Sequence, residues 1–187
     1  GGLSIHFFIV LPLLFYFFTG INPRRHFLAI SSALATAFAT SSSNATLPVT
    51  MRSVEKNAGV SNKVSSFVLP MGATINMDGT ALYECAGVLF ISQVLGIDLS
   101  IYSQFTVVIT ALLASIGAAG IPSAGLVMIF IVTQAVGFQD VDVAIIVGTM
   151  LAVDRPLDMM RTMVNIFSDS IGASIIAHSE GETLYKG

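Results

Sequence analysis

Six polar side chains share one helical face near the C-terminal end of the sequence, and four of them are ionisable. They are Asp154, Asp158, Arg161, Thr162, Asn165 and Asp169. Each residue of an α-helix turns by about 100°, so these positions form a stripe roughly 100° wide. Carboxylates, a guanidinium and an amide on one face can bind a small molecule that carries charge.

The rest of the chain has the composition of a membrane protein. Of its 187 residues, 54% are hydrophobic and 10% are charged, and its mean hydropathy is +0.84. Soluble domains carry about 25% charged residues. The alternative, a water-soluble protein with a fully buried helical core, would have too few charges for its surface. Ionisable groups at membrane depth are costly, so the stripe indicates a binding site.

Charge and cysteine content exclude other classes of protein. The net charge of −3 provides no basic field for nucleic acid. The single cysteine, Cys85, excludes an internal disulfide framework and a cysteine-based metal cluster, so we expect it to be a small apolar filler. The chain begins at Gly1 without a charged leader, so we expect no signal peptide and a truncated polypeptide.

The apolar segments differ in length, and most are too short to span a bilayer. Residues 3–19 are just long enough. Two pairs of shorter segments follow, each pair separated by polar or small residues: 27–40 and 46–55 around 41–44, then 103–116 and 123–137 around 117–122. Segments of about 10 to 14 apolar residues are typical of re-entrant pieces, so we predict two helical hairpins.

Two longer segments follow the hairpins in turn. Residues 64–95 are interrupted at 76–79, and residues 141–177 carry the polar stripe. The predicted hairpin tips, 42–48 and 116–122, share an Ala and an aliphatic-Pro pair at equal spacing. The repeated order of hairpin and helix indicates two structural repeats, and interrupted segments at corresponding positions indicate the central site of a transporter.

Loop charges predict the orientation of the hairpins. Basic residues flank the first hairpin and acidic residues flank the second: Arg24, Arg25, Arg52, Lys56 and Lys63 against Asp98, Asp140 and Asp142. The positive-inside tendency places the base of the first hairpin in the cytoplasm and that of the second outside. Hairpins that enter from opposite faces meet near the midplane, as two gates around one site would.

The interruption at Asn76-Met77-Asp78-Gly79-Thr80 suits a cation. Unwound backbone in lipid persists only where a cavity or a ligand satisfies it. Exposed carbonyls, an amide and a carboxylate are hard oxygen ligands that favour Na+. The alternative is a kink in which Asn76 and Asp78 only cap the next helix. Likewise, the Ser run at 41–43 either binds a carboxylate at a positive helix end or is only an N-cap.

Four motifs together resemble the glutamate transporter family, the dicarboxylate/amino acid:cation symporters. They are residues 41–50, 72–80, 114–117 and 158–165. The resemblance implies an all-α polytopic membrane protein with two re-entrant hairpins, a broken helix and inverted repeats, which transports its substrate by an elevator motion and is not an enzyme. The implied transport domain comprises helix 6 (3–22), hairpin 1 (25–57), broken helix 7 (64–96), hairpin 2 (103–138) and helix 8 (141–178), without the N-terminal scaffold helices.

The resemblance also implies a substrate site. Its residues would be Ser42, Ser43, Thr80, Ile121, Gly125, Asp158, Arg161, Thr162 and Asn165. Arg161 would hold the side-chain carboxylate of an acidic amino acid and Asp158 its ammonium group. A ligand lacking either group would leave one of these charges unpaired. An unpaired charge in a closed site lowers the binding free energy by several kcal/mol.

Three Na+ sites and one coupling group are implied as well. The first Na+ site comprises Gly72, Asn76, Asn165 and Asp169, and the second comprises Thr74, Met77, Ser115, Ile116 and Ala118. A third uses Asn76 and Asp78, with its remaining ligands on a missing helix. Family members usually carry a further Arg at the position of Ser41 or Met159, for which Arg155 substitutes here. Glu84 is expected to couple transport to protons, and the alternative is a buried Glu84–Arg155 ion pair.

The sequence therefore predicts a fragment of a Na+-coupled symporter for L-aspartate or L-glutamate, with the second hairpin as its gate and no cofactor. The family alternatives are proton-coupled dicarboxylate or neutral amino acid transport. An ion channel is a further alternative, which Arg161 disfavours because it would repel a permeant cation, and a non-transporting scaffold is another. Expected partners are Na+, with H+ or K+ as further coupling ions, and the lipid bilayer of a plasma or bacterial inner membrane, with a cytoplasmic C-terminus and a homotrimer in the full-length protein.

Overall fold

The structure is a computed structural model that describes residues 1–118 and 120–185. Over these residues it contains helices and turns and no strand, so the predicted all-helical fold is confirmed. The helices, in chain order, are α1 (Gly2–Ile5), the π-helical η1 (His6–Val10), α2 (Leu11–Thr19), α3 (Pro23–Ala29), α4 (Ser31–Thr40), α5 (Ser43–Ser53), the π-helical η2 (Val54–Ala58), α6 (Asn62–Ile75), α7 (Asp78–Val94), α8 (Ile101–Gly117), α9 (Ala124–Ala135) and α10 (Asp140–Ser179).

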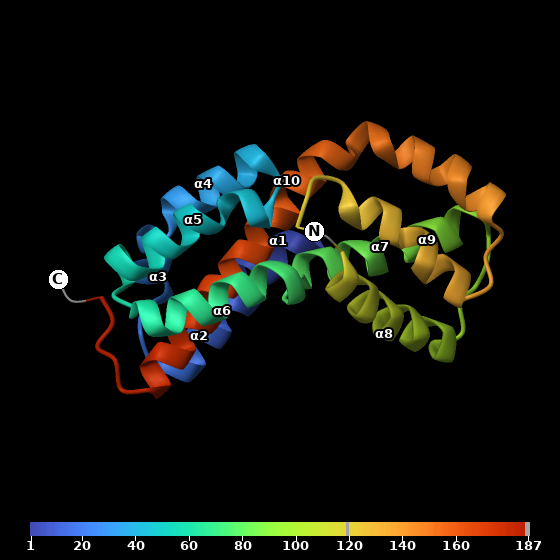
Figure 1. Ribbon diagram of the computed structural model, residues 1–187. Helices are drawn as coiled ribbons and strands as arrows, with labels where there is room; N and C mark the ends of the chain where they lie inside the picture. Colours follow the sequence, from blue (N-terminus) through green and yellow to red (C-terminus); the bar gives the residue numbers. More distant parts are fainter. Residues whose placement is uncertain (119, 186–187) are drawn as a thin grey trace.

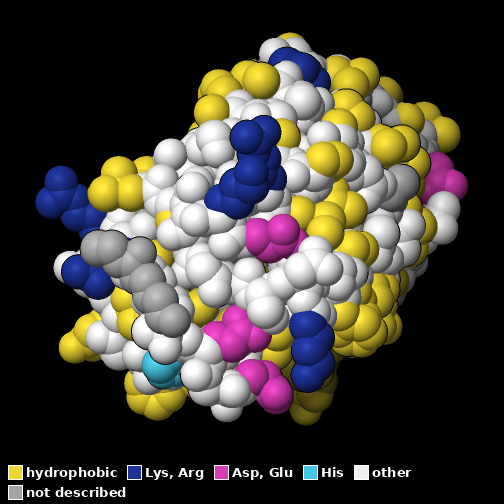
Figure 2. Space-filling model, turned by 60° about the vertical axis from the view of Figure 1, so that its left-hand side comes forward, with side chains coloured by type: hydrophobic (Ala, Val, Ile, Leu, Met, Phe, Trp, Pro, Cys, Tyr) yellow, Lys and Arg dark blue, Asp and Glu magenta, His cyan; other side chains and the backbone are white. Residues whose placement is uncertain are grey.

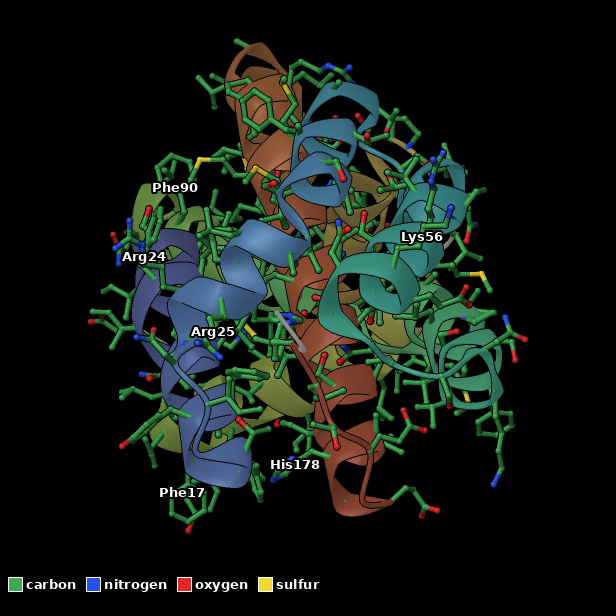
Figure 3. The ribbon with its side chains drawn as sticks, turned by 90° about the vertical axis from the view of Figure 1, so that its left-hand side faces the viewer. Phe17, Arg24, Arg25, Lys56, Phe90 and His178 are labelled. Atoms are coloured by element: carbon green, nitrogen blue, oxygen red, sulfur yellow. The ribbon has the colours of Figure 1, made fainter. Side chains whose placement is uncertain are left out.

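The 40-residue helix α10 is the central element. It packs against α2, α4, α5, α6, α7 and α9. In Figure 1 it runs the length of the elongated molecule, from orange to red. Figure 3 looks along the long axis and shows α10 between α2 on one side and α5 with α6 on the other. Successive parts of α10 therefore contact most of the other helices.

The first helical pair, α4 and α5, lies in the half of the molecule that holds the C-terminus (Figure 1). Helix α4 ends because Ser41 adopts the left-handed conformation, with φ of +51°. Helix α5 begins at once, because the Ser42 hydroxyl caps it by accepting a hydrogen bond from the Ala45 amide at 3.2 Å. The pair packs against α10 and α6.

The second helical pair, α8 and α9, lies in the other half of the molecule (Figure 1). Ser100 caps α8 through the Ser103 amide at 3.1 Å, and α9 follows Ser123, whose φ is +60°. The pair packs mainly against α7, while α9 also contacts the first part of α10. Ala119, within the predicted second tip, lies outside the described residues.

The predicted interruption of the segment 64–95 is present. Helix α6 ends at Ile75, the backbone departs from helical geometry at Asn76 and Met77, and α7 starts at Asp78. The break is shorter than the sequence indicates, since Asp78 and Gly79 are already helical. The segment therefore consists of two half-helices, α6 and α7, which meet near the middle of the molecule (Figure 1).

The outer surface is strongly apolar. Large side chains such as Phe17, Ile101 and Tyr102 are 80%, 73% and 84% exposed. One continuous helix, Gly2–Thr19, is long and apolar enough to cross a membrane, and Ile101–Gly117 and Ala124–Ala135 are shorter apolar helices. Exposed apolar area of this extent fits a lipid environment better than water.

Charged side chains gather at the two ends of the long axis. Arg24, Arg25, Arg52, Lys56 and Lys63 belong to α3, α5, η2 and α6, at the end that Figure 2 turns forward and that Figure 3 labels in part. Asp98, Asp140 and Asp142 lie at the opposite end, before α8 and at the start of α10. The apolar exterior thus separates an acidic end from an end that holds these five basic residues together with Glu55, Glu180 and Glu182, which we call the basic end.

Candidate functional site

The tips of the two helical pairs meet beside the middle of α10. The Ser42 hydroxyl donates a hydrogen bond to the Gly120 carbonyl at 2.6 Å, and the Asn44 amide donates to the same carbonyl at 3.4 Å. These contacts join residues that lie almost eighty positions apart in the sequence. Both tips therefore border the same small volume.

Helix α10 presents its polar stripe to this volume. Asp154, Asp158, Arg161, Thr162, Asn165 and Asp169 are all buried. Arg161 donates to Oδ1 of Asp158 through Nη2, and its guanidinium carbon lies 4.5 Å from the ring centroid of Tyr83. The stripe therefore faces the protein interior and not lipid.

One nitrogen of Arg161 is unsatisfied. Its Nη1 is buried and has no hydrogen-bond partner among the described residues. A buried guanidinium N–H without an acceptor costs free energy. An anion bound there would remove this cost, and a carboxylate matches the planar fork of donors.

Gly125 provides the space beside this nitrogen. A Cβ at Gly125 would lie 2.6 Å from Nη1 of Arg161 and 3.1 Å from Cγ2 of Thr80. Real side chains do not come so close, so any larger residue would displace the guanidinium. The absence of a side chain at this position keeps Arg161 accessible from the second tip.

A small cavity lies between the tips and α10. Its lining includes eight of the nine predicted substrate residues, namely Ser43, Thr80, Ile121, Gly125, Asp158, Arg161, Thr162 and Asn165. Its volume is about 10 Å³, which is about the room one water needs. The structure thus brings these residues together, but an amino acid fits only if a tip moves.

Ser42, the ninth predicted substrate residue, does not line the cavity. Its hydroxyl is used to cap α5 and to bind Gly120. The prediction that it contacts substrate conflicts with this geometry, because both functions point the hydroxyl along the tip contact. The N-cap alternative describes Ser42 better. Ser41, which the sequence predicts only as part of the 41–43 run, also lines the cavity, as do Gly120 and Ala124, which no sequence pattern assigned to the site.

Asn165 connects the broken helix to the stripe. Its Oδ1 accepts a hydrogen bond from the Gly79 amide at 2.8 Å, and its Nδ2 lies 3.2 Å from Oγ1 of Thr80. One free donor at the start of α7 is thereby satisfied from α10. Asn165 thus fixes the break relative to the site.

The first predicted Na+ set is largely assembled. Nδ2 of Asn76 donates to Oδ1 of Asp169 at 2.9 Å, and a Cβ at Gly72 would lie 2.5 Å from that oxygen. Oδ2 of Asp169 is buried without a partner among the described residues. The side chain of Asn165, the fourth member, turns instead toward Gly79 and Thr80. A carboxylate oxygen without a donor is suited to a cation.

The second predicted set lies where two helices end. Helix α6 packs beside α8, and a Cβ at Gly120 would lie 3.1 Å from the Ala73 carbonyl. Met77 and Ala118 both line the central cavity, whereas Thr74 is exposed and bonds only to its own helix. Ser115 and Ile116 lie in the last turn of α8. Two helix C-termini supply partial negative charge for a cation.

Asp78 of the third predicted Na+ site has hydrogen-bond partners that the sequence does not indicate. Oδ2 of Asp78 lies 2.7 Å from Nε2 of His6, and Oδ1 accepts from the Ser168 hydroxyl at 2.8 Å. The side chain of Asp78 does not cap α7, so the capping alternative is wrong for this residue. His6 lies on η1, and nothing in the sequence relates it to a residue 72 positions later.

Glu84 and Arg155 do not interact. Glu84 is fully buried on α7, and both of its carboxyl oxygens lack hydrogen-bond partners among the described residues. Arg155 is exposed on α10, and the described residues contain no ion pair between the two. The Glu84–Arg155 ion pair is therefore wrong, because α10 turns Arg155 away from the interior.

Comparisons with known proteins agree with this geometry. Residues 1–179 match the model of the sodium:dicarboxylate symporter family. The chain is 53% identical over 176 residues to excitatory amino acid transporter 3 of Mus musculus, covering 94% of the chain and 33% of that protein. It is 50% identical over 178 residues to an excitatory amino acid transporter of Caenorhabditis elegans, covering 95% of the chain and 35% of the relative.

A third comparison, with human excitatory amino acid transporter 1, gives 51% identity over 177 residues, or 95% of the chain and 32% of that protein. The chain thus spans about a third of the length of the curated relatives it matches. These relatives are named as transporters, not as enzymes.

Proposed function

Because the chain belongs to the sodium:dicarboxylate symporter family, we propose that it forms the substrate- and ion-binding part of a Na+-coupled transporter of acidic amino acids. The names of the relatives support amino acid transport. The observation that carries the proposal is the buried, unsatisfied Nη1 of Arg161 in a cavity bordered by both tips. Proteins of this family are integral to the membrane, and the apolar exterior agrees.

Arg161 and Asp158 provide the recognition. Nη1 of Arg161 would bind the side-chain carboxylate of aspartate or glutamate, and Asp158 would bind the ammonium group. In the structure the two side chains neutralise one another, so each charge is already partly compensated before a ligand arrives. A ligand with both charged groups can replace this pairing, while one with a single group leaves a buried charge behind.

Na+ is proposed as the co-transported ion. The unpartnered Oδ2 of Asp169, close to Asn76 and Gly72, supports the first site. The adjacent C-terminal ends of α6 and α8 support the second. The second site would lie beside the second tip, at the end of α8, so Na+ bound there would favour the closed position of that tip. Asp78, with both oxygens bonded to His6 and Ser168, supports the third site least.

The second helical pair is proposed as the gate. The cavity is too small for an amino acid, and the second tip covers Arg161 and Asp158. Outward movement of this tip would admit substrate, and an elevator motion of the closed unit would carry it across the bilayer. We place the basic end in the cytoplasm, with the pairs as re-entrant hairpins from opposite faces. The homotrimer is proposed for the whole protein.

Binding experiments on the full-length protein test the proposal. Calorimetric titration with L-aspartate, L-glutamate and L-serine, each with and without Na+, should show tight binding of the acidic amino acids only with Na+. Arg161→Ala should weaken aspartate binding by on the order of a hundredfold, since it removes the charge partner of the carboxylate. Arg52→Gln, an exposed arginine at the basic end, is the control. Equal aspartate affinity in Arg161→Ala, or aspartate binding that does not depend on Na+, would reject the proposal.

Proton coupling at Glu84 is a second candidate function. A fully buried carboxyl group without partners is costly when ionised, and protonation removes that cost. Glu84→Gln should therefore reduce the pH dependence of aspartate uptake by proteoliposomes. Unchanged pH dependence would remove Glu84 from the coupling, and Arg155, exposed on α10, has no contact here that supports a part in it.

A further inference from the structure

Ser123, the last residue of the second tip before α9, makes two hydrogen bonds to α10. Its backbone N–H donates to Oδ2 of Asp158 at 2.9 Å, and its hydroxyl donates to Oδ2 of Asp154 at 3.0 Å. These bonds fasten one residue of the tip to two carboxylates one helical turn apart. The tip is thus held over the cavity by direct contact with the stripe.

The two carboxylates differ in what else they bind. Asp158 lines the cavity, and its other oxygen accepts from Arg161. Asp154 does not line the cavity, is 2% exposed, and accepts from the Tyr83 hydroxyl at 2.8 Å through its other oxygen. Both oxygens of Asp154 are therefore used within the protein.

The two hydrogen bonds of Ser123 differ in whether substrate competes for them. A substrate ammonium at Asp158 competes with the Ser123 N–H for the same carboxylate. The Ser123 hydroxyl keeps its partner, since Asp154 is out of reach of the cavity. The contact with Asp154 therefore persists when substrate occupies Asp158.

We propose that Asp154 is a positioning residue that keeps the second tip closed over bound substrate through the Ser123 hydroxyl. This inference rests on the proposed function, because it names the contact that sets how long the acidic amino acid stays bound. Tyr83 extends the contact, since its hydroxyl orients Asp154 while its ring packs under the Arg161 guanidinium.

The backbone at Ser123 allows a clean variant. Its φ of +60° lies in the left-handed region, where glycine is unstrained. Ser123→Gly removes the CH2OH side chain and keeps the N–H that binds Asp158. Ser123→Ala removes the same hydroxyl at a strained position, so a common effect of both variants belongs to the hydroxyl and not to the backbone. Ser103→Ala, at the far end of the same helical pair, is the control.

The test measures release of radiolabelled aspartate from the full-length protein at saturating Na+. Ser123→Gly and Ser123→Ala should both release aspartate roughly tenfold faster than wild type, as expected for loss of one hydrogen bond to a charged group. Ser103→Ala should match wild type. Asp154→Asn should add little in the Ser123→Gly background, because the hydroxyl through which it acts is gone.

Hydrogen exchange without substrate provides a second readout. The amides of residues 120–126 should exchange faster in Ser123→Gly than in wild type, while peptides from the first pair stay unchanged. Wild-type release and exchange rates in Ser123→Gly would overturn the inference, as would an undiminished effect of Asp154→Asn in that background. If wild type binds no acidic amino acid, the proposed function fails, and the exchange rates still decide whether Ser123 and Asp154 hold the tip.

Discussion

The two helical pairs reach the same cavity, but they are anchored very differently. His26, on α3 directly before the first pair, is bonded to Tyr185 at 2.6 Å and to Ser170 at 3.0 Å, so buried and half-buried polar contacts fasten this base to the rest of the protein. At the base of the second pair, the side-chain contacts are exposed, such as Gln134 with Asp140 at 3.2 Å.

The hydrophobic packing places the two pairs in separate buried clusters. One core cluster, which includes Phe15, Ile30 and Phe167, joins the first pair to α2, α6 and α10. The other, which includes Ile91, Ile129 and Val143, joins the second pair to α7 and the start of α10. The polar stripe lies between them. A site built between two separately packed elements can open without the unfolding of either one, and the exposed side-chain contacts at the base of the second pair support that pair as the moving part.

The largest expected effect tests the anchoring of the first pair. His26 is fully buried, bonds through both ring nitrogens and stacks on Phe15 with centroids 4.9 Å apart. His26→Ala should lower the free energy of unfolding by about 3 kcal/mol, since it creates a cavity and removes a hydrogen-bond partner from the hydroxyls of Tyr185 and Ser170. Thermal unfolding of the full-length protein measures this. His178→Gln, an exposed histidine, is the control, and equal melting temperatures would refute rigid anchoring.

The next effect concerns the second pair. Gly125→Ala should weaken aspartate binding by roughly ten- to a hundredfold, because the new methyl group meets Nη1 of Arg161 and overpacking of this kind costs about 1–3 kcal/mol. Gly148→Ala is the matched control, since nothing lies within 4 Å of its Cβ position. Calorimetric titration measures both, and the comparison fails if both variants bind as wild type does.

A smaller effect is expected where the pairs touch. Ser42→Ala removes the bond to the Gly120 carbonyl and the cap of α5, at about 1 kcal/mol for each contact. Hydrogen exchange should rise several-fold at both tips and not at the bases. Ser31→Ala, an exposed serine on α4, is the control. Faster exchange at the bases alone would mean that the tips do not hold each other.

The smallest effect concerns the C-terminal segment at the base of the first pair. Glu182 accepts from the Ser61 amide at 2.8 Å and the Ser61 hydroxyl at 2.6 Å, and these bonds lower the pKa of its carboxyl group. Because the pKa of Glu182 is lower in the folded protein than in the unfolded chain, its carboxylate stabilises the fold at pH values above the unfolded pKa of roughly 4.3. This stabilisation is lost as the pH falls through the folded-state pKa. Because water screens this carboxylate, the effect should stay below about 1 kcal/mol.

Melting temperatures between pH 6 and roughly pH 3.5 measure this last effect. The wild-type value should fall relative to that of Glu182→Gln as the carboxylate is protonated. Parallel curves for the two proteins would show that Glu182 does not fasten the segment.

Local pattern explains what the sequence could predict. The stripe on α10 follows from residue spacing on one regular helix, so Asp158, Arg161 and Asn165 were found together. The break at Asn76 and the polar tip at Ser41 to Ser43 interrupt apolar segments and are visible without a structure. The resemblance to a known family supplied the ion sets, whose members share no single helix.

Long-range pairings explain what it could not predict. His26 with Tyr185, His6 with Asp78, and Ser123 with Asp154 join residues on separate elements, and no periodicity relates them. The predicted Glu84–Arg155 pair failed for the same reason, since the rotation of α10 relative to α7 is set by packing. Ser123 carried no signal of its own, because nothing in its sequence context indicates a left-handed backbone.

The central position of α10 has a consequence for biosynthesis. A ribosome makes the chain from its N-terminus, so α10, against which most other elements pack, emerges after all the other helices described above. Until then, the first amide groups of α7 lack Asn165 and the second tip lacks both of its carboxylates. The earlier segments must therefore wait in the translocon or bilayer as incompletely satisfied helices, and a chain that stops before residue 154 leaves them without a partner.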